Sequence, residues 1–151
     1  YITVGGLIGY LDYYVPVVIK YSYSKGTITG TGRISGLIGY AYNYDYYRVL
    51  PVIEQCYSAM TLDSRASAGG ILGYLEGYPC IIDCFTTNTD PDHYIYYDGY
   101  PYGEVTNVYS FPDGYVTGAE WTNGPTTWED SGAWETPIAS YPKLLGVDGQ
   151  D

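Results

Sequence analysis

The sequence predicts an all-β protein, and three observations support that fold class. Tyrosine occurs 22 times and glycine 20 times in 151 residues. Tyrosine and β-branched residues favour strands, whereas glycine and proline favour turns. Good helix formers are scarce, with one methionine and six Lys plus Arg. A short motif also recurs, so we expect an antiparallel β-sandwich or a β-repeat stack of three to four units of about 30 residues each.

The recurring motif consists of Gly, two aliphatic residues, Gly and Tyr. It begins at Gly6, Gly36 and Gly70, and a proline and an aliphatic pair follow each copy. Repetition at this spacing indicates one supersecondary unit that is copied and packed against its neighbours. We therefore expect a single β-rich domain over residues 7–144. Residues 1–6 would form an N-terminal arm, and residues 145–151 would form a tail.

Alternation of side chains with a period of two predicts individual strands. Residues 17–31 are expected to form a hairpin that turns at Lys25-Gly26, because glycine tolerates a positive φ. Residues 52–66 have helical spacing after Pro51, but the alignment of the motif copies favours a strand there, with at most a short helix near residues 58–65. In the Gly- and Pro-rich second half, short strands are expected at residues 93–97, 105–111 and 115–121.

Four tyrosines at alternate positions would line one face of a strand. They are Tyr40, Tyr42, Tyr44 and Tyr46. Their rings could cover a core or pack on Gly-rich strands, with the hydroxyls reaching water or backbone. The alternative is an exposed row of rings that serves as a stacking platform for sugars or for another subunit.

The net charge of −11 is divided unevenly along the chain. Residues 1–65 carry five basic and four acidic residues, a net charge of +1. Residues 66–151 carry thirteen acidic residues and only Lys143 as a base, a net charge of −12. Nucleic acid is therefore not expected as a partner, because phosphate binding needs clustered Lys and Arg. The acidic half could be a solvated surface, a region that binds cations, or a face that meets a less acidic face of another copy.

The three cysteines bear on the cellular compartment. Cys56, Cys80 and Cys84 do not have the spacing of a zinc site. One disulfide that uses Cys56 is expected in an oxidising compartment, and three buried thiols are the alternative. The chain begins at Tyr1 without Met and has no apolar run of 18 residues. We therefore expect a secreted, processed chain with no membrane span.

No catalytic arrangement is predicted. His93 is the only histidine, and no Gly-x-Ser-x-Gly pattern occurs. Paired carboxylates could serve glycoside hydrolysis, but nothing marks one as buried, so a hydrolase is the least favoured alternative. No cofactor is expected beyond a calcium ion, for which Asp90, Asp92 and Asp98 could supply oxygen ligands.

The three tryptophans lie close together in the sequence, among acidic residues. They are Trp121, Trp128 and Trp134, and Glu129 follows the second. Aromatic rings beside carboxylates are typical of carbohydrate-binding faces, where rings stack on sugars and acids accept hydroxyl hydrogen bonds. Such rings can equally close one end of a small β-domain core.

The function that we expect from the sequence is structural. Internal repeats, a Tyr/Gly/Thr-rich composition and two halves of different charge indicate a secreted subunit that self-assembles into a filament, sheath or surface layer. Residues Tyr1, Ile2, Thr3 and Val4, followed by Gly5-Gly6, could add a strand to the sheet of a neighbouring copy. The main alternative is a carbohydrate-binding module that uses the Trp/acid face to bind polysaccharide.

Overall fold

The computed structural model describes residues 2–13, 17–43, 52–62, 67–88, 96–101, 103–110, 128, 131–135 and 141–150. Strands dominate these residues, so the all-β prediction is confirmed. The first nine strands are β1 (Thr3–Gly5), β2 (Ile8–Tyr13), β3 (Val18–Lys20), β4 (Tyr23–Ile28), β5 (Arg33–Ser35), β6 (Ile38–Asn43), β7 (Val52–Glu54), β8 (Tyr57–Leu62) and β9 (Ser67–Gly69). The others are β10 (Leu72–Gly77), β11 (Cys80–Thr86), β12 (Tyr96–Pro101), β13 (Glu104–Ser110), β14 (Trp134–Glu135) and β15 (Lys143–Leu144).

The sheets are mostly parallel, so the predicted antiparallel sandwich is wrong. One sheet has the order β1-β5-β9 and a second the order β12-β10-β6-β2. A third joins β3-β7-β11-β8-β4 and adds β13 beside β11. Among the strands that the structure describes, only β14 and β15 pair in an antiparallel way. A period of two is the same in both kinds of sheet, which is why the alternation predicted strands but not their direction.

The predicted hairpin at Lys25-Gly26 does not form. Strand β4 runs straight through these two residues, where Lys25 pairs with Ala59 and Gly26 with Met60 of the parallel strand β8. Gly26 has a φ of 136°, which glycine adopts without the steric cost that other residues meet. The glycine that indicated a turn therefore serves an extended strand.

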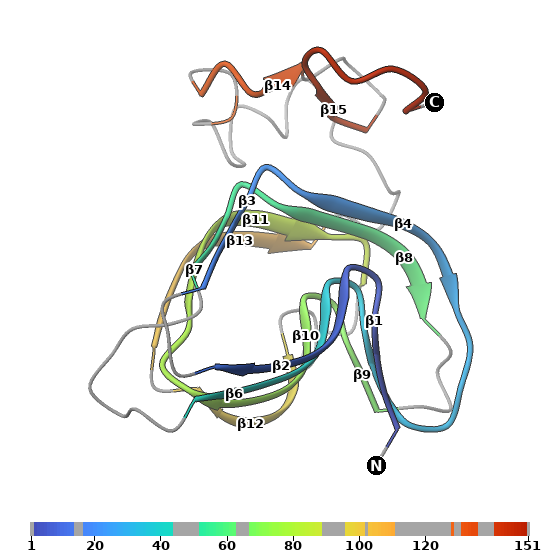
Figure 1. Cartoon of the computed structure of the whole chain (residues 1–151), viewed down its shortest axis with the longest axis vertical. Coiled ribbons are helices and arrows are strands. Elements are labelled where there is room, and N and C mark those ends of the chain that lie inside the picture. Colours follow the sequence, from blue (N-terminus) through green and yellow to red (C-terminus); the bar gives the residue numbers. More distant parts are fainter. Residues whose placement is uncertain are drawn as a thin grey trace.

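The parallel pairing follows from the way in which the chain winds (Figure 1). Ile8 pairs with Ile38, and Ile38 pairs with Leu72, so the chain returns to the same sheet after 30 and then 34 residues. In the same register Tyr10, Tyr40 and Tyr74 are neighbours across three strands. The three copies of the motif thus lie side by side in the second sheet.

The main core lies between the second and third sheets. Its buried members are Ile19, Leu37, Ile38, Ala41, Ile53, Cys56, Ile71, Leu72, Leu75, Ile81 and Cys84. Both aliphatic residues of the second and third motif copies belong to this set. In the first copy only Ile8 packs against this core, from a partly buried position.

Other element predictions had mixed outcomes. Residues 52–62 contain strands β7 and β8, so the preference for strand over helix is confirmed there, and the short helix expected near residues 58–65 does not form over residues 58–62. β13 matches the strand expected at 105–111, and β12 includes Tyr96 and Tyr97 of the run at 93–97, whose first three residues lie outside the described residues. The run at 115–121 lies outside the described residues.

The two ends of the sequence contribute to the described structure as well. Within the expected N-terminal arm, β1 pairs with β5 of its own chain, and the Arg33 amide donates to the Ile2 carbonyl at 3.0 Å. Within the expected tail, the Gln150 side-chain amide donates to the Leu144 and Val147 carbonyls, and the Leu144 amide donates back to it. In Figure 1 the segment with β14 and β15 lies over the outer face of the third sheet.

Candidate functional site

The first glycine of the motif allows two parts of the chain to approach closely. A Cβ on Gly36 would overlap the Ser58 side chain and the Gly70 carbonyl, and a Cβ on Gly6 would come within 2.8 Å of the Ser24 Cβ. The Ser24 hydroxyl donates to the Gly36 carbonyl from its buried position. The close packing of these two parts of the chain therefore requires a glycine at this position.

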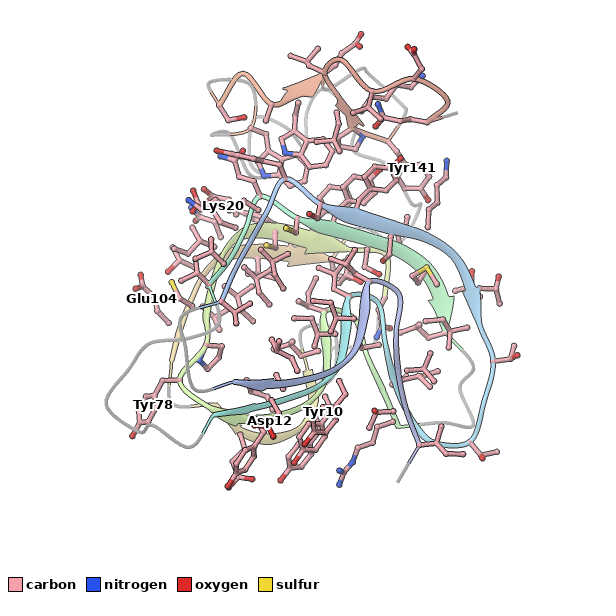
Figure 2. All side chains as sticks on the ribbon, viewed as in Figure 1. Tyr10, Asp12, Lys20, Tyr78, Glu104 and Tyr141 are labelled. Carbon is pink, nitrogen blue, oxygen red and sulfur yellow. The ribbon has the colours of Figure 1, made fainter. Side chains whose placement is uncertain are left out.

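The tyrosine of the motif forms an external stack. The ring centroids of Tyr10 and Tyr40 are 4.9 Å apart, and those of Tyr40 and Tyr74 are 5.0 Å apart. The Arg33 guanidinium lies 4.1 Å from the Tyr74 ring centroid, within cation–π range. Tyr10 is 58% exposed and points away from the sheet (Figure 2). The motif therefore encodes glycine contacts and core residues inside and a tyrosine ladder outside.

The predicted tyrosine row is described only for its first half. Tyr40 and Tyr42 lie on one face with ring centroids 6.4 Å apart, and both are partly buried. Burial and the neighbouring Tyr74 raise the pKa of Tyr40. Tyr44 and Tyr46 lie outside the described residues.

Four residues with a left-handed backbone form the corner of the third sheet, and the sequence analysis did not predict them. Tyr21, Gln55, Asp83 and Asn107 all have φ between 50° and 53°, which is uncommon for residues other than glycine. Each directly follows a member of one row of paired residues, in which Lys20 pairs with Glu54, Glu54 with Ile82 and Ile82 with Thr106. The side chains of Asn107 and Asp83 are hydrogen-bonded at 2.9 Å. Asn and Asp tolerate a left-handed backbone, and this is the one sequence feature that could have indicated the corner. Tyr21 and Gln55 lack that feature.

The two ends of the winding expose positions that are buried in its middle. Leu37 and Ile71 are fully buried, whereas the equivalent Leu7 in the first turn is 43% exposed. At the opposite end Val105 continues the buried row of Ile53 and Ile81 but is 39% exposed.

We call strands β1–β4 the N-terminal edge and strands β12 and β13 the C-terminal edge. Among the described residues, every strand of both edges has a pairing partner on one side only. Unpaired N–H and C=O groups and exposed apolar side chains are the features by which a sheet edge recruits another strand.

Charged groups accompany both edges. The Lys20 ammonium lies 2.5 Å from a Glu54 carboxylate oxygen, and this hydrogen bond raises the pKa of Lys20. Lys25 lies 4.8 Å from the Tyr141 ring centroid. At the C-terminal edge the Thr106 hydroxyl donates to the Glu104 carboxylate at 3.1 Å. Lys20 and Glu104 project outward on the same side of the molecule (Figure 2).

We call the described residues from Trp128 onward the C-terminal segment. This segment covers an aromatic ladder on the outer face of the third sheet. Tyr23, Tyr57 and Phe85 stack with centroid separations of 5.0 and 4.8 Å. Trp128 and Trp134 are both buried against this ladder, and their own rings stack at 4.6 Å. These two tryptophans therefore occupy a second core, the other role considered for them. Trp121 and Glu129 lie outside the described residues.

Polar contacts fix the same covering. The Trp128 indole N–H donates to the Asp83 carbonyl at 2.7 Å. The Tyr57 hydroxyl donates to the Pro142 carbonyl at 3.0 Å, and the Tyr141 ring stacks on Tyr57. Burial, and then the nearby Tyr23 and Tyr141 hydroxyls, raise the pKa of Tyr57 well above its ordinary value of 10.0.

The expected disulfide is not formed. All three cysteines are free thiols and are buried, which was the alternative. Cys80 and Cys84 lie on the same strand, β11, but only Cys84 belongs to the main core. Cys56 and Cys84 face the core from adjacent strands and donate to backbone carbonyls, at 3.3 Å for Glu54 and 3.2 Å for Ile82. Burial raises the pKa of Cys84, so its thiol form is favoured.

The other candidate sites are only partly covered by the structure. Asp90, Asp92 and His93 lie outside the described residues, and Asp98 is placed in β12 by its backbone. In the part of the chain that is described, no three His, Cys, Asp or Glu side chains are grouped as metal ligands would be. Nor does that part contain a helix with the length and apolar character needed to cross a membrane. Comparison with known proteins gives no matching family model, no similar curated protein and no similar solved structure.

Proposed function

We propose that this protein is a structural subunit that associates end to end with further copies, building an extracellular filament, sheath or surface layer. The observation that carries the proposal is the exposure of Leu7 and Val105, which continue rows of otherwise buried side chains. A further turn of chain packed on either edge would bury them. Burying apolar surface of this kind favours association, at about 25 cal/mol per Å².

The charged residues at the N-terminal edge do not oppose such contacts. Lysines on edge strands commonly protect a sheet from pairing with other chains. Here Lys20 is paired with Glu54 and Lys25 lies over the Tyr141 ring, so both charges already have partners in their own chain. Two different edges that meet form a heterologous contact, which extends into a filament when it does not close into a ring.

Negative-stain electron microscopy of the purified chain, with and without calcium, tests the proposal. We expect regular filaments or sheets from the unmodified protein. Leu7→Lys places a charge at the N-terminal edge and is expected to abolish them. Leu145→Lys is the matched control, because Leu145 is 54% exposed but lies in the C-terminal segment. Dispersed monomers of the unmodified protein in both conditions would rule the proposal out.

A further inference from the structure

We propose that the N-terminal edge binds the C-terminal edge of a second copy in a parallel arrangement that continues the register of the sheets. β13 of one copy would lie beside β3 and β4 of the next. Glu104 would then neighbour Val18, and Tyr109 would neighbour Tyr23. This inference rests on the proposed function and adds to it a partner surface, a direction and a register.

The register comes from the rows inside one chain. Val18 pairs with Val52, Val52 with Cys80 and Cys80 with Glu104, always between parallel strands. The residue that would follow Glu104 in the same row is the Val18 of another copy. In the neighbouring row Val105 would then pack on Ile19, as Ile81 packs beside Ile53 within the chain.

The backbone at the two edges bends at the same position. Asn107 in β13 has a φ of 53°, and Tyr21 between β3 and β4 has a φ of 50°. Asn107 directly follows Thr106 of β13, and Tyr21 directly follows Lys20 of β3. Thr106 and Lys20 would be neighbours in the proposed register. A strand with a matching corner can stay paired with its neighbour on both sides of the bend. Within the chain, the neighbouring segments that bend at Gln55 and Asp83 do so. Straight strands would lose pairing at this corner.

The aromatic row also continues across the junction. Tyr57 stacks on Tyr23 and on Phe85, and Phe85 pairs with Tyr109 in the register of β11 and β13. Tyr109 is partly buried and packs against the second core. At the junction it would meet the Tyr23 of the next copy, and the spacing of parallel strands, about 4.8 Å, matches the stacking distance inside the chain.

Charge favours unlike edges over like edges. In the proposed register Thr106 lies beside Lys20, and Glu104 lies two residues away on the same outer face. Diagonal neighbours in a sheet are about 7–8 Å apart, so Glu104 would approach the Lys20 ammonium as a second carboxylate beside Glu54 of the Lys20 chain. The whole chain has the same bias, with +1 in residues 1–65 and −12 in residues 66–151.

Cysteine cross-linking between two tagged preparations tests the register. One preparation carries Val18→Cys and the other Glu104→Cys, and the mixture is oxidised with diamide. We expect roughly tenfold more mixed dimer than either like dimer, because adjacent positions have a high effective concentration. Lys20→Cys with Thr106→Cys is a second pair in register. The unmodified chain gives the background, which should be low because its three thiols are buried.

Val18→Cys with Ser110→Cys, six residues out of register, is the matched control and should give little mixed dimer. Filaments that cross-link mainly as Val18→Cys like dimers would overturn the proposed polarity and leave the structural function standing. Equal yields from the control pair would overturn the register. An unmodified chain that forms no assembly in electron micrographs would overturn both the register and the function.

Discussion

At the residue scale, the glycines of the motif are explained by contact distances. Gly36 lies where a side chain would overlap Ser58 and the Gly70 carbonyl. Gly39, the second glycine of the same copy, has the Val4 backbone at 2.7 Å from where its Cβ would be. Since these neighbours are backbone atoms or buried side chains, they cannot move aside at little cost.

Gly36→Ala is therefore expected to lower the free energy of unfolding by about 1–3 kcal/mol or more, the range for overpacked cores. Gly30→Ala is the matched control, because a Cβ there meets no atom within 4 Å. Its effect should stay within about 0.5 kcal/mol. Chemical denaturation followed by circular dichroism measures both. Equal stability of the two variants would contradict the packing explanation of the motif.

Tyr57 gives a prediction about alkaline pH. The raised pKa of Tyr57 means that the folded state holds the phenol proton more tightly than the unfolded state, which loses it near pH 10. The stabilisation is complete below pH 10 and is lost as the pH rises beyond it, because the unfolded state then binds fewer protons.

Tyr57→Phe is expected to make the loss of stability above pH 10 less steep. At neutral pH it should cost about 1 kcal/mol, because the hydrogen bond to the Pro142 carbonyl is lost. Denaturation curves at pH 8, 10 and 11 compare the two proteins. Parallel pH dependences would show that the Tyr57 hydroxyl is not protected by the C-terminal segment.

At the element scale, the C-terminal segment is attached by a few large contacts. Trp128 is fully buried, stacks on Trp134 and donates to the Asp83 carbonyl. Trp128→Ala is expected to weaken the packing of the segment by about 3–5 kcal/mol, as for other buried aromatic residues. The emission of Trp134 should shift to longer wavelength as its ring meets water. Leu145→Ala, at an exposed position of the same segment, is the control and should leave the spectrum unchanged.

The strands could be predicted from the sequence much better than their arrangement. The Gly-aliphatic-aliphatic-Gly-Tyr motif marked residues that the structure places in one sheet, and the composition indicated an all-β chain. Strand direction could not be predicted, because alternation is identical in parallel and antiparallel sheets. Lys25-Gly26 has the composition of a turn, and only the pairing of β4 with β8 shows that it continues a strand.

The candidate site was predictable only in outline. Self-association through Tyr1, Ile2, Thr3 and Val4 stays a prediction from the sequence. Thr3 and Val4 lie in β1 of the N-terminal edge and Ile2 lies beside it, whereas Tyr1 is outside the described residues. The sequence showed no sign that Leu7 and Val105 differ from their buried equivalents, because exposure depends on the position of a turn within the winding. The corner formed by Tyr21, Gln55, Asp83 and Asn107 has no shared residue type, so no pattern revealed it.

At the scale of the whole molecule, the central claim is that the two edges of the winding are complementary to each other. Leu7→Lys blocks the N-terminal edge and Val105→Lys blocks the C-terminal edge, and each variant keeps its other edge intact. Both residues are partly exposed, so a lysine at either position is compatible with the fold.

Sedimentation velocity of the two variants, alone and mixed in equal amounts, tests this claim most directly. Each variant alone is expected to remain a monomer, because it lacks one of the two edges that must meet. The mixture is expected to form a one-to-one dimer through the intact C-terminal edge of Leu7→Lys and the intact N-terminal edge of Val105→Lys. A mixture that stays monomeric at concentrations where the unmodified chain assembles would contradict the account.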